Sequence, residues 1–320
     1  MSPKTPPQQR RISDDQKSSG LQHLQHEPVL LTQTVDVLSP MKGETYLDLT
    51  AGYGGHAGAV VERIGTAANA VLVDRDIMAI RALEPLVTAG ARVLHSDFLS
   101  AAKQLVQEGA QFDMILADFG VSSPQFDIPE RGFTLRSKGP LDMRMDQRQS
   151  VTAQQLVNET SEAELRQIIQ RYGEEPMARR IATAIREARP LSSTSDLVDV
   201  ISRSVPGHKA KDACVRTFQA LRIAVNHELD QVRGLLELLP DLLRPGGRVA
   251  VISFHSLEDR LVKRYLQEEM RKGYEARLQI LTKRPLAGNI YDVHNPRARS
   301  AKLRAAVKIK NQQKQNTERT

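Results

Sequence analysis

Residues 48–56 read Asp-Leu-Thr-Ala-Gly-Tyr-Gly-Gly-His, and this stretch decides the fold that we expect. It follows a short β-rich run and comes before a helical pattern. Glycines at such a turn let the backbone pass close to a bound ligand, because no Cβ stands in the way. Asp74 follows Gly52 by 22 residues, where a carboxylate can accept hydrogen bonds from both hydroxyls of a ribose. Together the two features predict a site for a cofactor that contains a nucleoside.

Two cofactors fit this loop. Gly52, Gly54 and Ala57 satisfy the G-x-G-x-x-G/A pattern of dinucleotide-binding proteins, so a nicotinamide dehydrogenase stays open at this point. Asp48 argues against a dinucleotide, since its charge beside the glycines would repel a pyrophosphate. The same charge suits a cationic sulfonium with an amino group, which favours S-adenosylmethionine. We expect His56 to shape the loop rather than to bind a metal ion, because no partner ligands lie at useful spacing.

The segments around the loop alternate between short β-rich runs and helical patterns, which is typical of parallel βαβ units. We expect a helix at 77–86, capped by Asp76, and strands at 45–49, 70–73, 92–95, 112–117 and 248–253. Ligands of open parallel sheets bind beyond the carboxyl ends of the strands. Phe98 and Asp118 follow the third and fourth strands, so both are candidates to line the site, Phe98 against a purine face.

After the fourth strand only loop and helix patterns follow, and they predict an all-helical insertion at 128–215. A long helical pattern at 213–239 then leads back to the sheet. The predicted organisation is a disordered arm at 1–25, a discontinuous core at 26–127 and 216–310 around the insertion, and a basic tail at 311–320.

The charge of the chain is concentrated at one end. Its 320 residues hold 45 Lys and Arg against 38 Asp and Glu, and eight of the basic side chains lie in the last 25 residues. Such a cluster favours a polyanion partner, although a solvated basic tail explains it equally well. A single cysteine excludes an intrachain disulfide, and no apolar run reaches the roughly 18 to 20 residues of a membrane span. We therefore expect a cytoplasmic protein without a membrane segment.

Longer strings then follow one another along about residues 26–310. They read HEPVLL at 26–31, GYGGH at 52–56, DRD at 74–76, DFGVSSPQ at 118–125, ERGF at 130–133, GPLDMRMD at 139–146, RTFQA at 216–220, SFHSLEDR at 253–260 and NPRARS at 295–300. In this order they resemble the bacterial 16S ribosomal RNA cytosine N4-methyltransferases, also called RsmH or MraW. Phe119 departs from the Leu that is usual in this family, and the segment 267–294 is shorter than in some relatives.

The resemblance implies an α/β fold, a Rossmann-like S-adenosylmethionine-dependent methyltransferase core with an inserted all-helical domain. The implied substrate is a decoding-centre cytosine of 16S ribosomal RNA, 1402 in rRNA numbering, in the small ribosomal subunit. The resemblance also assigns contacts with S-adenosylmethionine to seven residues, Gly54, Gly55, His56, Asp74, Phe98, Asp118 and Gln125.

The chemistry at cytosine N4 gives Asp118 a second possible role. The N4 lone pair is delocalised into the ring, and an acceptor that takes a hydrogen bond from an N4 proton localises it. Asp118 stands where DNA amino-methyltransferases carry an Asp/Asn/Ser-Pro-Pro-aromatic motif, but both prolines are missing here. Cofactor binding and catalysis therefore both stay open for Asp118.

The RNA substrate predicts further contacts. Phe126 or Phe133 could stack on the target base once it leaves its helix. Phosphates would meet basic side chains at Arg131, Arg136, Lys138, Arg144, Arg297, Arg299, Lys302 and Arg304. We assign His255, Glu258 and Asp259 to a structural or substrate-edge loop, because methyl transfer needs no metal. Two other functions stay open: a non-catalytic RNA-binding ribosome assembly factor and an NAD-dependent dehydrogenase.

Overall fold

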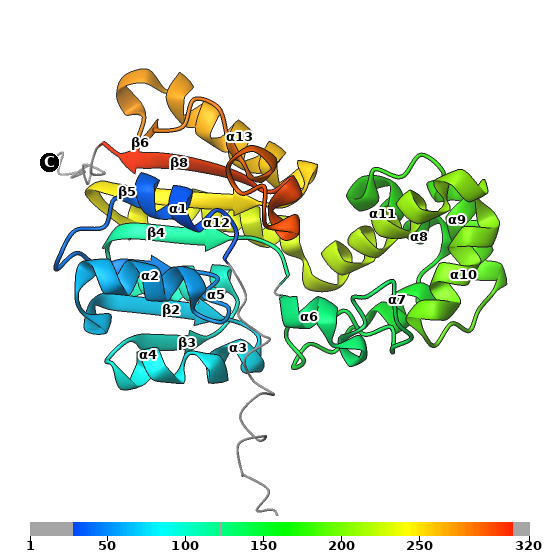
Figure 1. The fold of residues 1–320 in the computed structure, drawn as a ribbon. Coiled ribbons are helices and arrows are strands. Elements are labelled where there is room, and N and C mark those ends of the chain that lie inside the picture. The colour runs from blue at the N-terminus through cyan, green and yellow to red at the C-terminus, as the bar shows by residue number, and fades with distance from the viewer. Residues whose placement is uncertain (1–27, 122, 310–320) are drawn as a thin grey trace, which may run out of the picture.

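The computed structural model describes residues 28–121 and 123–309. The predicted arm at 1–25 and the predicted tail at 311–320 lie outside these ranges. Within them, a sheet with helices on both faces forms one half of the molecule, and a group of helices forms the other half (Figure 1).

One sheet organises the first half. Its order is β3-β2-β1-β4-β5-β8-β6, with β7 beside β8. Strands β1 to β5 are parallel, and β8 is antiparallel to its three partners. The bounds are β1 (Tyr46–Asp48), β2 (Ala70–Asp74), β3 (Arg92–His95), β4 (Phe112–Asp118), β5 (Leu243–Ser253), β6 (Leu278–Ile280), β7 (Leu286–Ala287) and β8 (Lys302–Lys308). The five predicted strands and the α/β class are confirmed, and the strand order reverses between β1 and β4, where such folds bind ligands.

The strands send alternate side chains into two apolar cores, as the period of two demands. In β4, Met114 and Leu116 pack on one face, while Ile115 and Ala117 pack on the other. The first face is covered by α1 (Leu31–Leu38), α2 (Gly55–Ile64) and α4 (Glu84–Thr88). The second face is covered by α5 (Phe98–Gln107), α12 (Glu228–Leu242) and α13 (Ser256–Arg271). Because both faces are buried, the strands are apolar almost throughout.

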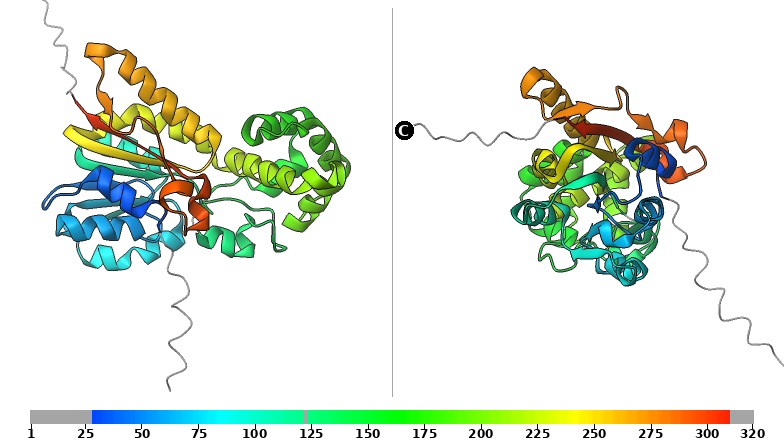
Figure 2. Two further views of the ribbon diagram at one scale, coloured as in Figure 1. Left: turned by 45° about the horizontal axis from the view of Figure 1, so that its top comes forward. Right: turned by 90° about the vertical axis from the view of Figure 1, so that its left-hand side faces the viewer.

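The helical half has an apolar core of its own. It contains α7 (Ala153–Glu159), α8 (Glu162–Gly173), α9 (Ala178–Glu187), α10 (Thr194–Ser204) and α11 (Gly207–Asn226). Leu165, Ile181 and Leu197 are fully buried in this core, together with Leu221 of α11. Figure 2 shows these helices beyond one end of the sheet, and in Figure 1 the β4 arrow points toward them. The helical half thus faces the carboxyl ends of the parallel strands.

Two predicted helices are broken in the structure. The predicted helix at 77–86 forms α3 (Ile77–Ala82) and α4, although Asp76 caps α3 as predicted by accepting the Met78 amide. The predicted pattern at 213–239 forms α11 and α12, which meet at His227 with a left-handed φ of 51°. The expected boundary at 215/216 falls inside α11, which packs in the helical core as far as Val225. We therefore propose His227 as the point where the chain returns to the sheet.

Short elements complete the described ranges. They are η1 (Ala67–Asn69), α6 (Ser123–Asp127), η2 (Pro129–Arg131), η3 (Gly273–Glu275), α14 (Gly288–Tyr291) and η4 (Pro296–Ser300). The α14–η4 segment, orange to red in Figure 2, lies at the end of the sheet that faces the helical half. No helix in the described part of the chain is long and apolar enough to cross a membrane.

Candidate functional site

A cavity of about 350 Å³ opens at the carboxyl ends of β1, β2 and β4. The segment before α1, the glycine loop, α6 and the starts of α5, α12 and α13 also contribute to its walls. Of the seven residues assigned to the cofactor, six line this cavity: Gly55, His56, Asp74, Phe98, Asp118 and Gln125. The seventh, Gly54, does not line it and instead turns the chain into α2 with a φ of 81°.

The glycine loop needs glycine for two different reasons. Gly52 has a left-handed φ of 51°, and its amide donates to Asp74 Oδ2 at 2.8 Å. At Gly55 a Cβ would come within 2.3 Å of Pro28 Cγ. The segment before α1 therefore closes over the loop only because position 55 carries no side chain.

Asp74 ends β2 and is oriented by backbone amides. Its Oδ2 accepts from Gly52, and its Oδ1 accepts from the amide of Asp76, each at 2.8 Å. Burial raises the pKa of Asp74, and these two hydrogen bonds oppose the shift. Each carboxylate oxygen can accept a second hydrogen bond, so Asp74 keeps acceptor capacity toward the cavity.

Asp118 ends β4 and has an oxygen that no described residue satisfies. Its amide donates to Thr50 Oγ1 at 2.6 Å, which ties β4 to the loop after β1. Within residues 28–121 and 123–309, its buried Oδ1 has no hydrogen-bond partner. Burial raises the pKa of Asp118 well above its ordinary value, and the carboxylates of Asp48 and Glu258 add to the shift. A buried acceptor without a donor costs free energy, so this oxygen fits a donor that a ligand supplies.

His56 lies between Asp118 and the segment before α1. Its Nε2 lies 3.1 Å from the carbonyl oxygen of Val29, which can only accept, so Nε2 is the protonated nitrogen in this hydrogen bond. Its Nδ1 lies 3.7 Å from Asp118 Oδ2. The buried ring thus packs beside Asp118 and is hydrogen-bonded to Val29.

Asp48 does not line the cavity, contrary to the expectation that its charge faces the ligand. It is fully buried, and it accepts from Tyr46 Oη at 2.8 Å and from the Thr50 amide at 3.1 Å. Burial raises the pKa of Asp48 to about 7. The carboxylates at the cavity wall are those of Asp74, Asp118, Glu228 and Glu258.

Two aromatic rings form the apolar part of the wall. The ring centroids of Phe98 and Phe119 lie 5.5 Å apart with a tilt of 39° between the planes. Both residues line the cavity, and such a surface suits a planar base. Phe119, a departure from the family pattern, therefore adds a second ring to this wall.

Comparison with known proteins agrees with this geometry. The model of the MraW methylase family matches residues 23–309. The chain belongs to this family. A ribosomal RNA small subunit methyltransferase H from Acidobacterium capsulatum is 46% identical over 88% of this chain and 98% of that relative. A protein of the same name from Synechocystis sp. is 43% identical over 92% and 96% of the two chains.

Membership of the MraW methylase family confirms the predicted class of enzyme, a methyltransferase that uses S-adenosylmethionine. The roles of single residues do not follow from membership, and the structure corrects several of the predictions for RNA.

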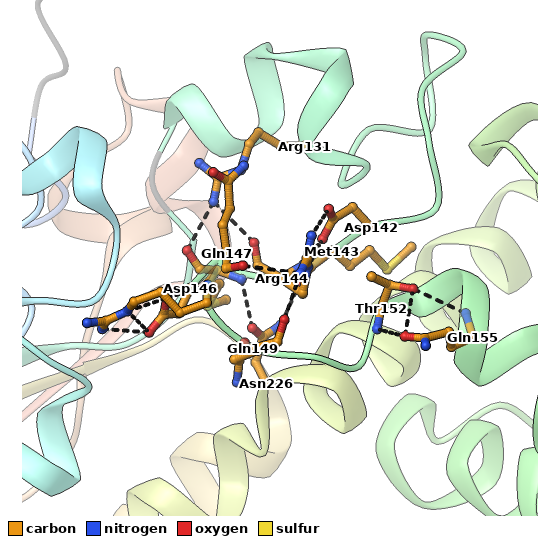
Figure 3. Close-up of polar contacts among 12 residues, drawn as sticks. Arg131, Asp142, Met143, Arg144, Asp146, Gln147, Gln149, Thr152, Gln155 and Asn226 are labelled. Atoms are coloured by element: carbon orange, nitrogen blue, oxygen red, sulfur yellow. Dashed lines mark hydrogen bonds and ion pairs between the residues drawn. The ribbon is translucent and has the colours of Figure 1, made fainter.

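Arg131 is not available to RNA, which contradicts its predicted role. The side chain is buried, and Nη1 donates to Asp76 Oδ2 at 2.7 Å. Nη2 donates to the carbonyl oxygens of Arg144 and Met145 (Figure 3). Asp76 Oδ2 also accepts from Gln125 Nε2 at 2.9 Å. Arg131 therefore helps to hold Gln125 at the cavity and joins the sheet to the loop before α7.

Arg144 is also bonded within the protein, but its side chain is 21% exposed, so its contact with RNA stays a prediction. Its Nε and Nη2 donate to Asp142 at 2.7 and 2.8 Å, and its Nη1 donates to two backbone carbonyls (Figure 3). Asn226 at the end of α11 binds the same loop, accepting the Met145 amide and donating to the Met143 carbonyl, each at 2.8 Å. This loop is thus fixed from both halves of the molecule.

The remaining RNA candidates divide by exposure. Arg297 and Arg299 are exposed on η4, and Arg136 and Lys138 are exposed before α7. Arg297 pairs with Asp127 at 3.1 Å, and Lys302 and Arg304 pair with Asp259 at 3.2 and 2.7 Å. Of these three side chains only Arg304 is largely buried, at 11% exposure. Phe133 is buried, whereas Phe126 is 45% exposed, so Phe126 alone of the two can meet a base.

Sequence reasoning missed several residues at the cavity, among them Arg75, Met145 and Glu228. Arg75 follows Asp74 directly, so the strand end could have revealed it. Met145 and Glu228 arrive from distant parts of the chain, which no local pattern connects to the glycine loop.

Glu258 also lines the cavity, beside His255, which caps α13. Potential ligand atoms of Glu228, His255 and Glu258 lie within 4.8 Å of one another. Arg222 already donates to both oxygens of Glu228 at 2.8 Å. The Arg222 guanidinium thus balances the charge of Glu228. The geometry of these three side chains alone does not make them a metal site.

Proposed function

We propose that this chain methylates N4 of a cytosine of 16S ribosomal RNA in the small ribosomal subunit, cytosine 1402 in rRNA numbering. The family supports methyl transfer, and the names of the relatives support a ribosomal substrate. The observation that carries the proposal is the buried Oδ1 of Asp118, an acceptor at the cavity without a donor in the described chain. A ribosomal substrate also implies that the protein works in the cytoplasm.

The residues that line the cavity suit the parts of S-adenosylmethionine. Asp74 would accept from the ribose hydroxyls, and Phe98 and Phe119 would lie against the adenine. The bound cofactor supplies a methyl group on a positively charged sulfur. Asp118 and Glu258 at the wall suit that charge, whereas they would repel a pyrophosphate.

Asp118 would act on the nucleophile. Its Oδ1 accepts a hydrogen bond from one N4 proton, which localises the lone pair and aims it at the methyl carbon. The N–C bond then forms as the C–S bond breaks, and the surplus proton on N4 leaves to Asp118 or to water. Positioning of this kind can lower a barrier by up to roughly 7 to 11 kcal/mol, so the proposal needs no protein nucleophile.

Binding measurements separate this function from its alternatives. Isothermal titration of the full chain should detect S-adenosylmethionine and no NAD. Binding of NAD instead would favour a dehydrogenase. Binding of neither ligand would favour an assembly factor without catalysis.

The substrate is tested in cells. Mass spectrometry of digested 16S ribosomal RNA, from cells with and without the gene, should reveal one methyl group lost from one cytidine. An unchanged methylation pattern would contradict the proposed substrate.

A further inference from the structure

Three large apolar side chains are exposed together on residues 288–300, a segment that we call the rim. Ile290, Tyr291 and Val293 are 66%, 51% and 63% exposed. Apolar residues exposed singly are normal on a protein surface, but a contiguous group marks a site of interaction.

The rim is firmly anchored, so its exposure is not that of a loose loop. Gly288 donates to the Ala301 carbonyl at 2.9 Å, and a Cβ at Gly288 would come within 1.9 Å of the Ala298 carbonyl oxygen. Asp292 accepts the Leu30 amide at 2.8 Å. A fixed backbone thus holds three apolar side chains in water, a cost that a ligand covering them would remove.

The rim contacts two segments that each contribute a residue to the cavity wall. Leu30, which Asp292 holds, lies two residues after Pro28 at the cavity wall. Arg297 pairs with Asp127 of α6 at 3.1 Å, and the same short helix carries Gln125 at the cavity. Figure 2 shows the rim between the sheet and the helical half.

Exposed cations flank the apolar group. Arg297 and Arg299 follow it on η4, and Lys283 and Arg284 precede it. Aromatic and apolar faces beside cations match an unstacked nucleobase and its phosphates. We propose that the rim binds single-stranded RNA next to the target cytosine, with Tyr291 stacked on a neighbouring base. This inference rests on the proposed function, because it takes RNA as the substrate.

Kinetics on small ribosomal subunits from cells that lack the gene give the first test. Tyr291→Ala should lower kcat/KM for the subunits by roughly 5- to 150-fold, the range of one base–aromatic stack. Tyr291→Phe should keep kcat/KM within about twofold, and neither variant should change the affinity for S-adenosylmethionine. Wild-type kcat/KM in Tyr291→Ala would overturn the proposal.

Tyr274→Ala is the matched control. Tyr274 is 95% exposed and lies just before β6, which pairs with the end of β8 opposite to the rim. This variant should leave kcat/KM unchanged. A loss equal to that of Tyr291→Ala would mean that the rim has no special role.

Fluorescence gives a readout that does not depend on methyl transfer. The sequence contains no tryptophan, so Tyr291→Trp and Tyr274→Trp each introduce a single reporter. A single-stranded RNA oligonucleotide should quench the first reporter and not the second. Quenching of Tyr291→Trp in a protein whose wild type transfers no methyl group would refute the proposed function and retain the rim. If the wild type methylates the RNA, Tyr291→Trp is not quenched and Tyr291→Ala keeps its kcat/KM, only the proposed RNA-binding role of the rim is refuted.

Discussion

Asp118 reaches the cavity with a carboxyl group whose protonation should be visible in the rate. Burial raises its pKa, and Asp48 and Glu258 add to the shift. The carboxylate is the stronger acceptor, so kcat should rise with pH as Asp118 loses its proton. Asp118→Asn should lower kcat about 100-fold and abolish this dependence. Single-turnover methylation across pH checks the prediction, and a variant with the wild-type profile would assign Asp118 to cofactor binding alone.

Asp48 is a buried carboxyl group that should destabilise the protein when it ionises. Its pKa is raised from 3.8 to about 7 by burial, so the folded state holds a proton that the unfolded state has lost between these pH values. The stabilisation that comes from the proton on Asp48 is fully present below a pH of about 4, and it is lost as the pH rises through about 7. Asp48→Asn removes it, so the unfolding free energy of the variant relative to wild type should grow by about 4 kcal/mol from pH 4 to pH 8.

Denaturant unfolding at several pH values measures this difference. Asp199→Asn, at an exposed position of α10, controls for the loss of a surface carboxylate. A difference between Asp48→Asn and wild type that stays constant with pH would contradict the prediction.

At the scale of elements, the strands could be predicted and the helix breaks could not. Each strand fills two cores with alternate side chains, as Met114 and Ile115 do in β4, and this leaves a plain apolar run in the sequence. The break at His227 leaves no such trace, since apolar residues recur at helical intervals on both sides of it. One residue in the left-handed region separates α11 from α12. A glycine at this position would have predicted the end of the helix, but the sequence has histidine.

His227 therefore gives a prediction of its own. It is exposed and has a φ of 51°, a conformation that costs an L-residue about 1 to 2 kcal/mol and glycine almost nothing. His227→Gly should raise the free energy of unfolding by up to about 1 kcal/mol, since the flexibility of glycine offsets part of the gain. Lys211→Gly, inside α11, should instead lower it by about 1 kcal/mol. Thermal unfolding compares the two, and losses of equal size would show that position 227 is not strained.

At the scale of the whole molecule, local patterns account for one part of the site. Asp74 and Asp118 end strands that plain apolar runs locate, Gly55 follows the loop after another such strand, and parallel pairing brings the three to one cavity. The sequence predicts Arg131 as an RNA contact because basic side chains bind phosphates, whereas the structure buries it against Asp76. Its partner Asp76 lies 55 residues away, and no periodicity in the sequence connects the two.

The pair of Arg131 and Asp76 joins the sheet to the start of the helical half, so its loss should affect both folding and cofactor binding. Arg131→Met leaves the buried carboxylate of Asp76 without its cation, which should lower the unfolding free energy by about 3 to 5 kcal/mol. Arg148→Met breaks an ion pair of the same 2.7 Å length whose arginine is 57% exposed, and it should cost less than about 1 kcal/mol.

The two variants also separate stability from binding. Gln125 and Arg131 share Asp76 Oδ2 as their acceptor, so Arg131→Met should let the Asp76 carboxylate shift together with Gln125 at the cavity and lower the affinity for S-adenosylmethionine. Arg148→Met should leave that affinity unchanged, because Asp146 is its only ion-pair partner in the described ranges. Calorimetric titration at a temperature where both variants are folded makes the comparison. Unchanged affinity in Arg131→Met would mean that this pair serves folding alone, and that Gln125 keeps its place without it.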